Sequence, residues 1–170
     1  LASGHFDLSV GSVIACAGVV AAVVMRDTNS VFLGVSAALV MGLIVGLING
    51  IVIAKLRVNA LITTLATMQI VRGLAYIFAN GKAVGVSQES FFVFGNGQLF
   101  GVPVPILIIL IVTAIAAFIL YRTRYGRHVT AVGSSRDVAR YSGIAVDRVR
   151  TMAFIIQGLC VAIAVLLYVP

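Results

Sequence analysis

The most informative candidate functional residues in this sequence are polar side chains that lie inside long apolar runs. Four of them lie on one stretch of chain: Asn59, Thr63, Thr64 and Thr67. Positions 59, 63 and 67 are spaced i, i+4 and i+8, which places them on one face of a helix. A hydroxyl stripe on a membrane helix hydrogen-bonds either to neighbouring helices or to a passing solute, and the spacing is compatible with both.

Asp7 is the second candidate, with Ser9 and Ser12 after it at the start of the apolar run 10–25. Asp or Ser in this place caps the exposed amide groups of a helix. A helix that starts partway through a membrane presents the same end to a cavity, so these residues are also candidates for lining a solute path. We predict that Asp7 and the threonine stripe face one polar interior, because polar groups are costly against lipid.

The sharpest feature outside the apolar runs is the segment 135–144. Ser135 is placed as an N-cap, Asp137 lies in the first turn, and Gly143 fits the left-handed position that ends a helix. A helix this short is marginal in water, so it needs a surface to dock on. It either packs on its own membrane helices or forms the interface for a cytoplasmic partner. The candidate interface residues are Arg136, Asp137, Val138, Ala139, Arg140, Tyr141 and Gly143.

Enzyme chemistry finds little support in the sequence. Two His and five acidic residues are scattered and form no metal cluster, and no Ser/His/Asp order stands out. Gly126 and Gly133 lack the surrounding pattern of a nucleotide-binding fingerprint. Cys16 and Cys160 fall inside apolar runs and are interpreted as small buried hydrophobes. We expect no catalytic residue, no cofactor and no metal.

The elements that must position these residues are membrane helices. Of 170 residues, 61% are hydrophobic and 10% are charged, with a mean hydropathy of +1.16. A soluble domain carries roughly 25% charged residues, and a disordered chain is poor in apolar ones. The apolar runs are 10–25, 31–54, 61–79, 104–121 and 151–169. They do not alternate as barrel strands do, so the predicted fold is an all-α polytopic transmembrane helix bundle, part of one membrane-spanning domain.

Basic residues predict the orientation of these spans. The net charge is +7, which in a soluble protein suggests a nucleic-acid partner and in a membrane protein marks the cytoplasmic loops. Seven Arg fall in 122–150, and Lys55 and Arg57 fall in 55–60, whereas 26–30 and 80–103 are neutral. We predict that 55–60 and 122–150 lie inside and the neutral segments outside. No nucleic-acid partner is expected.

The second run carries a small residue at every fourth position. These residues are Gly34, Ala38, Gly42, Gly46 and Gly50. Such ladders let two helix backbones approach closely in a membrane. Tight packing within one subunit is the main interpretation, and dimerisation through this face is the alternative.

The neutral segment 80–103 is apolar but broken by glycines and Pro103. Asn96-Gly97 is a tight-turn signal, and Phe91, Phe92, Phe94 and Phe100 surround it. We predict an external re-entrant or surface-lying segment. Its aromatic residues either anchor it at the membrane interface or form a docking surface for an outside partner.

Three stretches of this sequence match known motifs. They are 6–12 (FDLSVGS), 58–67 (VNALITTLAT) and the loop from Tyr125-Gly126-Arg127 through 131–133 to Ser142-Gly143-Ile144. They resemble the signatures of bacterial ABC sugar permeases of the ribose/arabinose/xylose type, and 58–106 is most similar to the L-arabinose members. In the loop, Ser135 and Asp137 replace the family's usual Asn and Glu, which keeps the capping pattern.

The resemblance implies the pore-forming subunit of an ATP-driven importer of a monosaccharide, such as the pentose L-arabinose, in the bacterial inner membrane. It implies a permease homodimer in the lipid bilayer, cytoplasmic ATP-binding subunits and a periplasmic sugar-binding protein. Such a subunit binds no ATP itself. Members of the family are longer, so an internal fragment is expected.

The matching loop implies an ATPase-coupling element at 122–150. We expect docking through the apolar side chains Val138, Ala139 and Tyr141, with Arg136 and Arg140 pairing with acidic residues of the ATPase.

The alternative is a secondary transporter or channel that works without an ATPase. A carrier coupled to protons or sodium usually places an ionisable residue at mid-span, and only Asp7 and Arg72 approach such a position. A membrane-embedded enzyme ranks last, since no catalytic cluster is present.

Overall fold

The computed structural model describes residues 6–85, 95, 97–99 and 101–168 of the chain. The five long helices are α1 (Val10–Thr28), α2 (Val31–Ala54), α3 (Ala60–Phe78), α5 (Val104–Arg122) and α8 (Val146–Tyr168). Each is long and apolar enough to cross a membrane. The predicted all-α polytopic bundle is therefore confirmed.

Two helix boundaries differ from the apolar runs. Helix α1 continues to Thr28 rather than stopping at 25, and α8 begins at Val146 rather than 151. Hydropathy marks where a chain meets lipid, whereas a helix continues for as long as its backbone hydrogen bonds do. Charged residues such as Arg26 and Arg148 therefore extend these helices past their apolar stretches.

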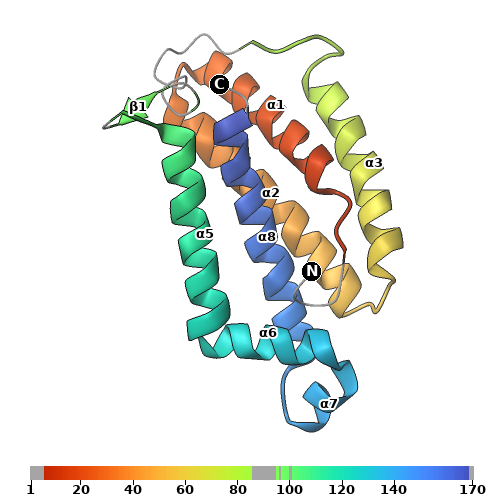
Figure 1. Cartoon of the computed structure of the whole chain (residues 1–170). Helices are drawn as coiled ribbons and strands as arrows, with labels where there is room; N and C mark the ends of the chain where they lie inside the picture. Colours follow the sequence, from red (N-terminus) through yellow and green to blue (C-terminus); the bar gives the residue numbers. More distant parts are fainter. Residues whose placement is uncertain (1–5, 86–94, 96, 100, 169–170) are drawn as a thin grey trace.

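Helices α1, α2, α3 and α8 form the packed bundle, while α5 stands to one side (Figure 1). Helices α6 (Arg124–Ser134) and α7 (Arg136–Tyr141) join α5 to α8. The linker between α2 and α3 lies at the same end of the bundle as α6 and α7 (Figure 1). The sequence predicts that 55–60 and 122–150 lie on the same side of the membrane, and the structure places both at one end of the bundle. Which end faces the cytoplasm stays a prediction.

The small-residue ladder of α2 is covered within this chain. A Cβ added to Gly46 would lie 2.5 Å from the carbonyl oxygen of Phe154, and one added to Gly42 would lie 2.5 Å from that of Gly158. Helices α2 and α8 therefore approach so closely that only hydrogen fits between them at these points. Because α8 occupies this face, tight packing within the subunit is the correct interpretation and dimerisation through the ladder is not.

Two of the hydrophobic clusters in the bundle involve α1. One joins Ala17, Ala21 and Met25 of α1 to Ala38 and Val165. The other contains Cys16, which is fully buried as expected for a small hydrophobe, whereas Cys160 is half-buried. Helix α5, in contrast, buries no residue in the described part of the chain.

The described portion of 80–103 contains a two-residue antiparallel ladder. Strand β1 (Gln98–Leu99) pairs with β2 (Val102–Pro103), and Gly101 in the connection has φ +79°. The predicted Asn96-Gly97 turn and the aromatic residues Phe91, Phe92, Phe94 and Phe100 involve positions outside the described residues.

Candidate functional site

Asp7 lies at the centre of a hydrogen-bonded group beside the start of α1. Its Oδ2 accepts a hydrogen bond from Nε2 of Gln157 on α8 at 2.8 Å. Its Oδ1 accepts from both the backbone N–H (2.8 Å) and the hydroxyl (2.6 Å) of Ser9. The carboxylate thus ties the segment before α1 to the middle of a helix that lies 150 residues later in the sequence.

Asn49 extends this group to two further helices. Its Nδ2 donates to Oγ of Ser9 at 3.2 Å, and its Oδ1 accepts from Oγ1 of Thr67 at 2.6 Å. Asn49 and Ser9 are buried. We call Asp7, Ser9, Asn49, Thr67 and Gln157 the polar network. It joins the N-terminal segment, α2, α3 and α8 by direct side-chain hydrogen bonds.

Asn49 and Gln157 are absent from the candidates named from the sequence. Both are amides inside uncharged apolar runs, 31–54 and 151–169, and this is the signal that could have found them, because such groups usually need a partner inside the bundle. The sequence does show their position on α2 and α8. It does not show that Gln157 donates to Asp7 or that Asn49 donates to Ser9.

The rest of the threonine stripe is satisfied within its own helix. Thr63 donates to the carbonyl of Asn59 at 3.0 Å, and Thr64 donates to that of Leu61 at 3.3 Å. Asn59 caps α3, since its Oδ1 accepts from the backbone N–H of Leu61 at 2.8 Å. Thr63 and Thr64 are buried, and among the described residues Thr67 is the member of the stripe that hydrogen-bonds to the polar network.

The predicted helix-capping role of Asp7 takes a more limited form. Ser9 is the N-cap of α1 and its side chain makes no capping hydrogen bond. The backbone N–H that donates to Asp7 is that of Ser9, which precedes the helix. Ser12 lies in the first turn of α1, half-buried and outside the polar network. The main partners of Asp7 are therefore other side chains rather than the end of α1.

The interior around the polar network is closed in this conformation. A cavity of about 10 Å³ remains between Asp7, Ser9, Asn49, Gln157 and their apolar neighbours. That is at the lower limit for one water molecule. Asp7 and Thr67 are linked through Ser9 and Asn49 in one packed network, and a role of either residue in a solute path stays a prediction.

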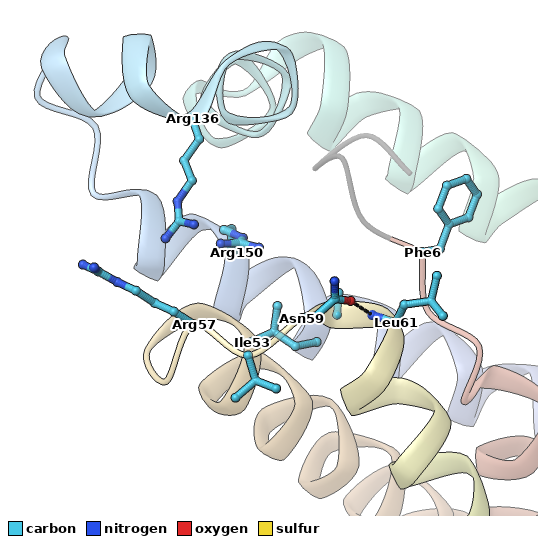
Figure 2. A pocket seen from close by; sticks show the side chains of 9 residues that line it. Phe6, Ile53, Arg57, Asn59, Leu61, Arg136 and Arg150 are labelled. Atoms are coloured by element: carbon cyan, nitrogen blue, oxygen red, sulfur yellow. Dashed lines mark hydrogen bonds between the residues drawn. The ribbon is translucent and has the colours of Figure 1, made fainter.

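Two adjoining cavities of about 320 and 440 Å³ lie at the α6–α7 end of the bundle. Arg57 and Arg136 line both of them. Figure 2 shows Arg57, Arg136 and Arg150 around the first cavity, supplied by the α2–α3 linker, α7 and α8. Arg57 has a φ of 58°, a left-handed backbone conformation that is uncommon for residues other than glycine.

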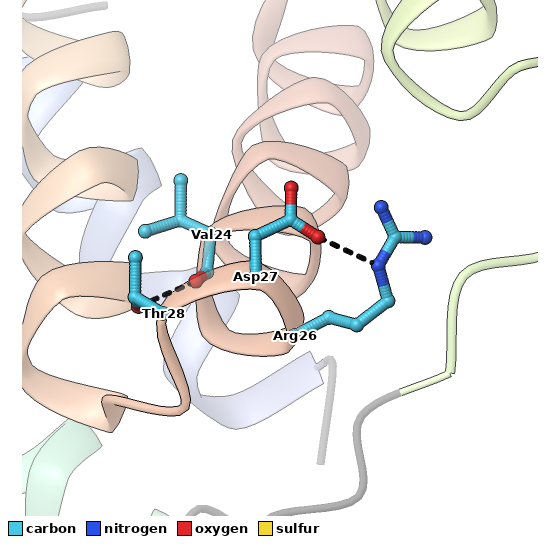
Figure 3. Close-up of polar contacts among 4 residues, drawn as sticks. All are labelled: Val24, Arg26, Asp27 and Thr28. Atoms are coloured by element: carbon cyan, nitrogen blue, oxygen red, sulfur yellow. Dashed lines mark hydrogen bonds and ion pairs between the residues drawn. The ribbon is translucent and has the colours of Figure 1, made fainter.

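The opposite end of the bundle is locally neutral. Nε of Arg26 lies 2.9 Å from Oδ1 of Asp27, and Thr28 donates to the carbonyl of Val24 at 2.6 Å (Figure 3). Both partners of the ion pair are more than half exposed, so it adds little stability. Because the pair has no net charge, it adds nothing to this end that would match the arginine-rich α6–α7 end.

Helix α7 has the caps that its sequence predicts. Ser135 Oγ accepts from the N–H of Val138 at 3.4 Å. At the other end, Gly143 has φ +79°, its N–H donates to the carbonyl of Arg140 at 3.0 Å, and the N–H of Ile144 donates to that of Ala139 at 3.1 Å. This pair of bonds is the Schellman motif that ends a helix.

The candidate coupling residues divide between two faces of α7. Ala139 is buried in a cluster with Val129, Val132, Val146 and Val149, so it packs on the chain's own core. The proposal that Ala139 docks on a partner is therefore corrected. Arg136 and Arg140, at spacings i−3 and i+1 from Ala139, line the second cavity on this inward side. Val138 and Tyr141 are 64% and 91% exposed on the other side.

Within the described ranges, no three His, Cys, Asp or Glu side chains come together in a way that could hold a metal ion. The polar groups that do gather are the polar network and the arginines of the two cavities. By their chemistry, the first group can form hydrogen bonds and the second can attract anions.

The whole chain, residues 1–170, matches the family described as "Branched-chain amino acid transport system / permease component". It is 53% identical to the L-arabinose transport system permease protein AraH of Escherichia coli (strain K12), over 96% of this chain and 50% of that protein. It is 43% identical to the L-arabinose ABC transporter permease protein AraH of Azospirillum brasilense, over 96% of this chain and 48% of that protein.

A more distant relative is the ribose import permease protein RbsC of Haemophilus influenzae, 37% identical over 93% of this chain and 50% of that protein. The chain thus spans about half the length of the curated relatives it matches. No solved structure matches it. With its full length matched and five helices long and apolar enough to cross a membrane, the chain belongs to the branched-chain amino acid transport system / permease component family.

Proposed function

We propose that this chain forms the membrane-spanning path of an ATP-binding-cassette importer that carries a monosaccharide, with L-arabinose as the first candidate. The observation that carries the proposal is the 53% identity to an L-arabinose permease over nearly the whole chain. The five apolar helices support a multi-pass location in the inner membrane.

The proposed partners are those that such an importer requires. ATP hydrolysis resides in separate cytoplasmic subunits, a periplasmic binding protein delivers the sugar, and a second permease copy completes the pore. The clustering of arginine at the α6–α7 end supports placing that end toward the cytoplasm, where the ATPase lies.

The proposed contact with the ATPase is the outward side of α7. Val138 and Tyr141 are apolar, exposed and only three residues apart, so they form one small docking face. Arg136 and Arg140 belong to the opposite side, and we therefore leave them out of this contact. Replacing both Val138 and Tyr141 by Asp should abolish stimulation of ATP hydrolysis by the sugar-loaded binding protein.

The proposed transport path passes through the polar network. Its side chains are the hydrogen-bonding groups that a sugar needs, and its closed cavity means that the helices must separate during transport. In a background with Cys16→Ala and Cys160→Ala, Asp7→Cys and Thr67→Cys should react with an aqueous thiol reagent during turnover and little at rest. Ile115→Cys, on the exposed apolar surface of α5, is the control and should stay inert.

Unchanged reactivity of Asp7→Cys and Thr67→Cys between rest and turnover would place the path elsewhere. Reaction of Thr64→Cys at rest would contradict the closed packing itself, since Thr64 is fully buried.

The transport proposal is tested with the full-length protein and its partner subunits in proteoliposomes. We expect uptake of labelled L-arabinose that requires ATP and the binding protein, with ribose and xylose as comparison sugars. Uptake driven by a proton or sodium gradient without ATP would instead establish the alternative, a secondary transporter.

A further inference from the structure

We propose that the two cavities at the α6–α7 end bind the phosphate headgroup of an anionic phospholipid. The cavities share Arg57 and Arg136 and adjoin each other at these side chains. We call the basic residues that line them the basic pocket. Its members are Lys55, Arg57, Arg136, Arg140, Arg148 and Arg150.

The basic pocket has many more basic than acidic lining residues. Among the described residues that line the two cavities, Asp147 is the one acid. It lies 4.0 Å from Nη2 of Arg136, and both side chains are about half exposed, so the pair is weak. Several guanidinium groups that share one small space repel one another, and an anion bound between them removes this repulsion.

The type of cation favours phosphate over other anions. Five of the six basic residues are arginine, whose planar guanidinium donates two parallel hydrogen bonds to phosphate oxygens. Arg57, Arg136 and Arg150 come from three separate elements and line the same side of one cavity (Figure 2). A phosphate placed between them can therefore contact more than one guanidinium.

Arg57 is held in place by an unusual backbone. Its φ of 58° lies in the left-handed region, which residues other than Gly, Asn and Asp seldom adopt. Such conformations persist where the surrounding structure imposes them, and they are concentrated at ligand sites. Here the conformation sets the position of Arg57 in the short linker between α2 and α3.

The apolar wall of the first cavity decides in favour of a lipid over a soluble phosphate compound. Phe6 and Leu61 line the cavity opposite the arginines and are 64% and 48% exposed. A phosphate compound with no hydrocarbon part would leave this wall uncovered, whereas a phospholipid covers it with acyl chain. The location at the ends of membrane helices also matches the depth of lipid headgroups, where basic pockets bind anionic lipids.

The test measures lipid retention by the full-length permease complex in detergent, by native mass spectrometry, after addition of phosphatidylglycerol or phosphatidylcholine. The wild type should retain phosphatidylglycerol selectively. The variant Arg57→Gln/Arg136→Gln should bind it more weakly by a factor on the order of ten or more. The matched control is Arg124→Gln/Arg127→Gln, which removes the same charge from exposed positions of α6 outside both cavities.

Selective loss in the pocket variant alone supports the proposal. Equal retention in both variants overturns it, because the lipid would then bind outside the pocket. Equal loss in both variants also overturns it, because binding would then follow net charge. If inorganic phosphate displaces phosphatidylglycerol or gives the same thermal stabilisation, the site takes soluble phosphate and the lipid assignment is wrong. Should the Gln pair fail to assemble, Arg57→Lys/Arg136→Lys keeps the charge and should still weaken retention, since Lys cannot bind phosphate in the bidentate way.

Discussion

Asn49, on α2, is the residue that connects this helix to α3 and to the segment before α1. Its amide uses both ends: Nδ2 donates to Ser9 and Oδ1 accepts from Thr67. Because neither water nor lipid can replace these partners at a buried position, the loss of the amide leaves two hydroxyls with fewer partners. The residue therefore has a structural role whatever solute the protein carries.

We expect Asn49→Ala to lower the stability of the full-length protein by about 1 kcal/mol, the usual magnitude for side-chain hydrogen bonds between membrane helices. The measurement is the thermal unfolding midpoint in detergent. Ser36→Ala is the control, since that hydroxyl bonds only to the carbonyl of Phe32 in its own helix. An equal loss in the two variants would show that the network adds nothing between helices.

Tyr125 makes stability depend on pH in the alkaline range. Burial raises its pKa from 10.0 to about 12, and its hydroxyl donates to the carbonyl of Val149 at 3.1 Å. The folded state favours the neutral phenol, so this stabilisation is complete below the unfolded pKa of about 10 and is lost as pH rises from there through about 12.

Accordingly, the wild type should lose more stability than Tyr125→Phe between about pH 9 and about pH 11, because phenylalanine has no proton to lose. Unfolding midpoints measured at the two pH values check this. Parallel curves for the two proteins would show that Tyr125 does not titrate with unfolding.

At the level of elements, the contact between α2 and α8 depends on the absence of side chains. Gly42 and Gly46 face backbone carbonyls of α8, which cannot move aside as a flexible side chain can. Van der Waals packing rather than the hydrophobic effect holds helices together in lipid, so the separation of the two backbones sets the strength of this contact.

Gly46→Ala should destabilise the protein by about 1–3 kcal/mol through overpacking. Gly73→Ala on α3 is the matched control, because a Cβ at Gly73 meets no atom within 4 Å and alanine favours the helix. The two variants are compared by their unfolding midpoints and by the yield of folded protein. If Gly46→Ala were as stable as Gly73→Ala, the close approach of α2 and α8 would be wrong.

The end of α7 depends on Gly143. A branched residue at φ +79° costs about 1–2 kcal/mol, so Gly143→Val should distort the exit of the helix and move Val138 and Tyr141. We expect lost stimulation of ATP hydrolysis by the sugar-loaded binding protein, while the membrane helices still insert. Gly143→Asn, which tolerates this conformation, should retain most of the stimulation. Normal stimulation in Gly143→Val would remove α7 from the coupling role.

For the whole molecule, charge and topology agree. The α2–α3 linker, α6 and α7 lie at one end, and together with the adjoining ends of α5 and α8 they carry most of the arginines, while the other end has the Arg26–Asp27 pair (Figures 1 and 3). In the Cys16→Ala/Cys160→Ala background, Lys82→Cys should react with a membrane-impermeant thiol reagent in intact cells, and Ser134→Cys only after lysis. The reverse pattern would invert the predicted orientation.

The sequence by itself determined the features that depend on neighbouring residues. Five spans follow from apolar runs of sufficient length, and the caps of α7 follow from Ser135 and Gly143. Motifs such as 6–12 indicated the permease family for the same reason, since each is a continuous stretch. These inferences needed no knowledge of which helices touch.

Tertiary structure alone decided which polar residues share an interior. Gln157 meets Asp7 across 150 positions, whereas Thr63 and Thr64, close to Thr67 in sequence, bond to their own helix. Tertiary structure also turned Ala139 inward and brought Arg57 beside Arg136 and Arg150. The physical reason is that helical periodicity fixes which residues share a face, while the partner of each face is set by how the helices pack, here by the close contact of α2 with α8.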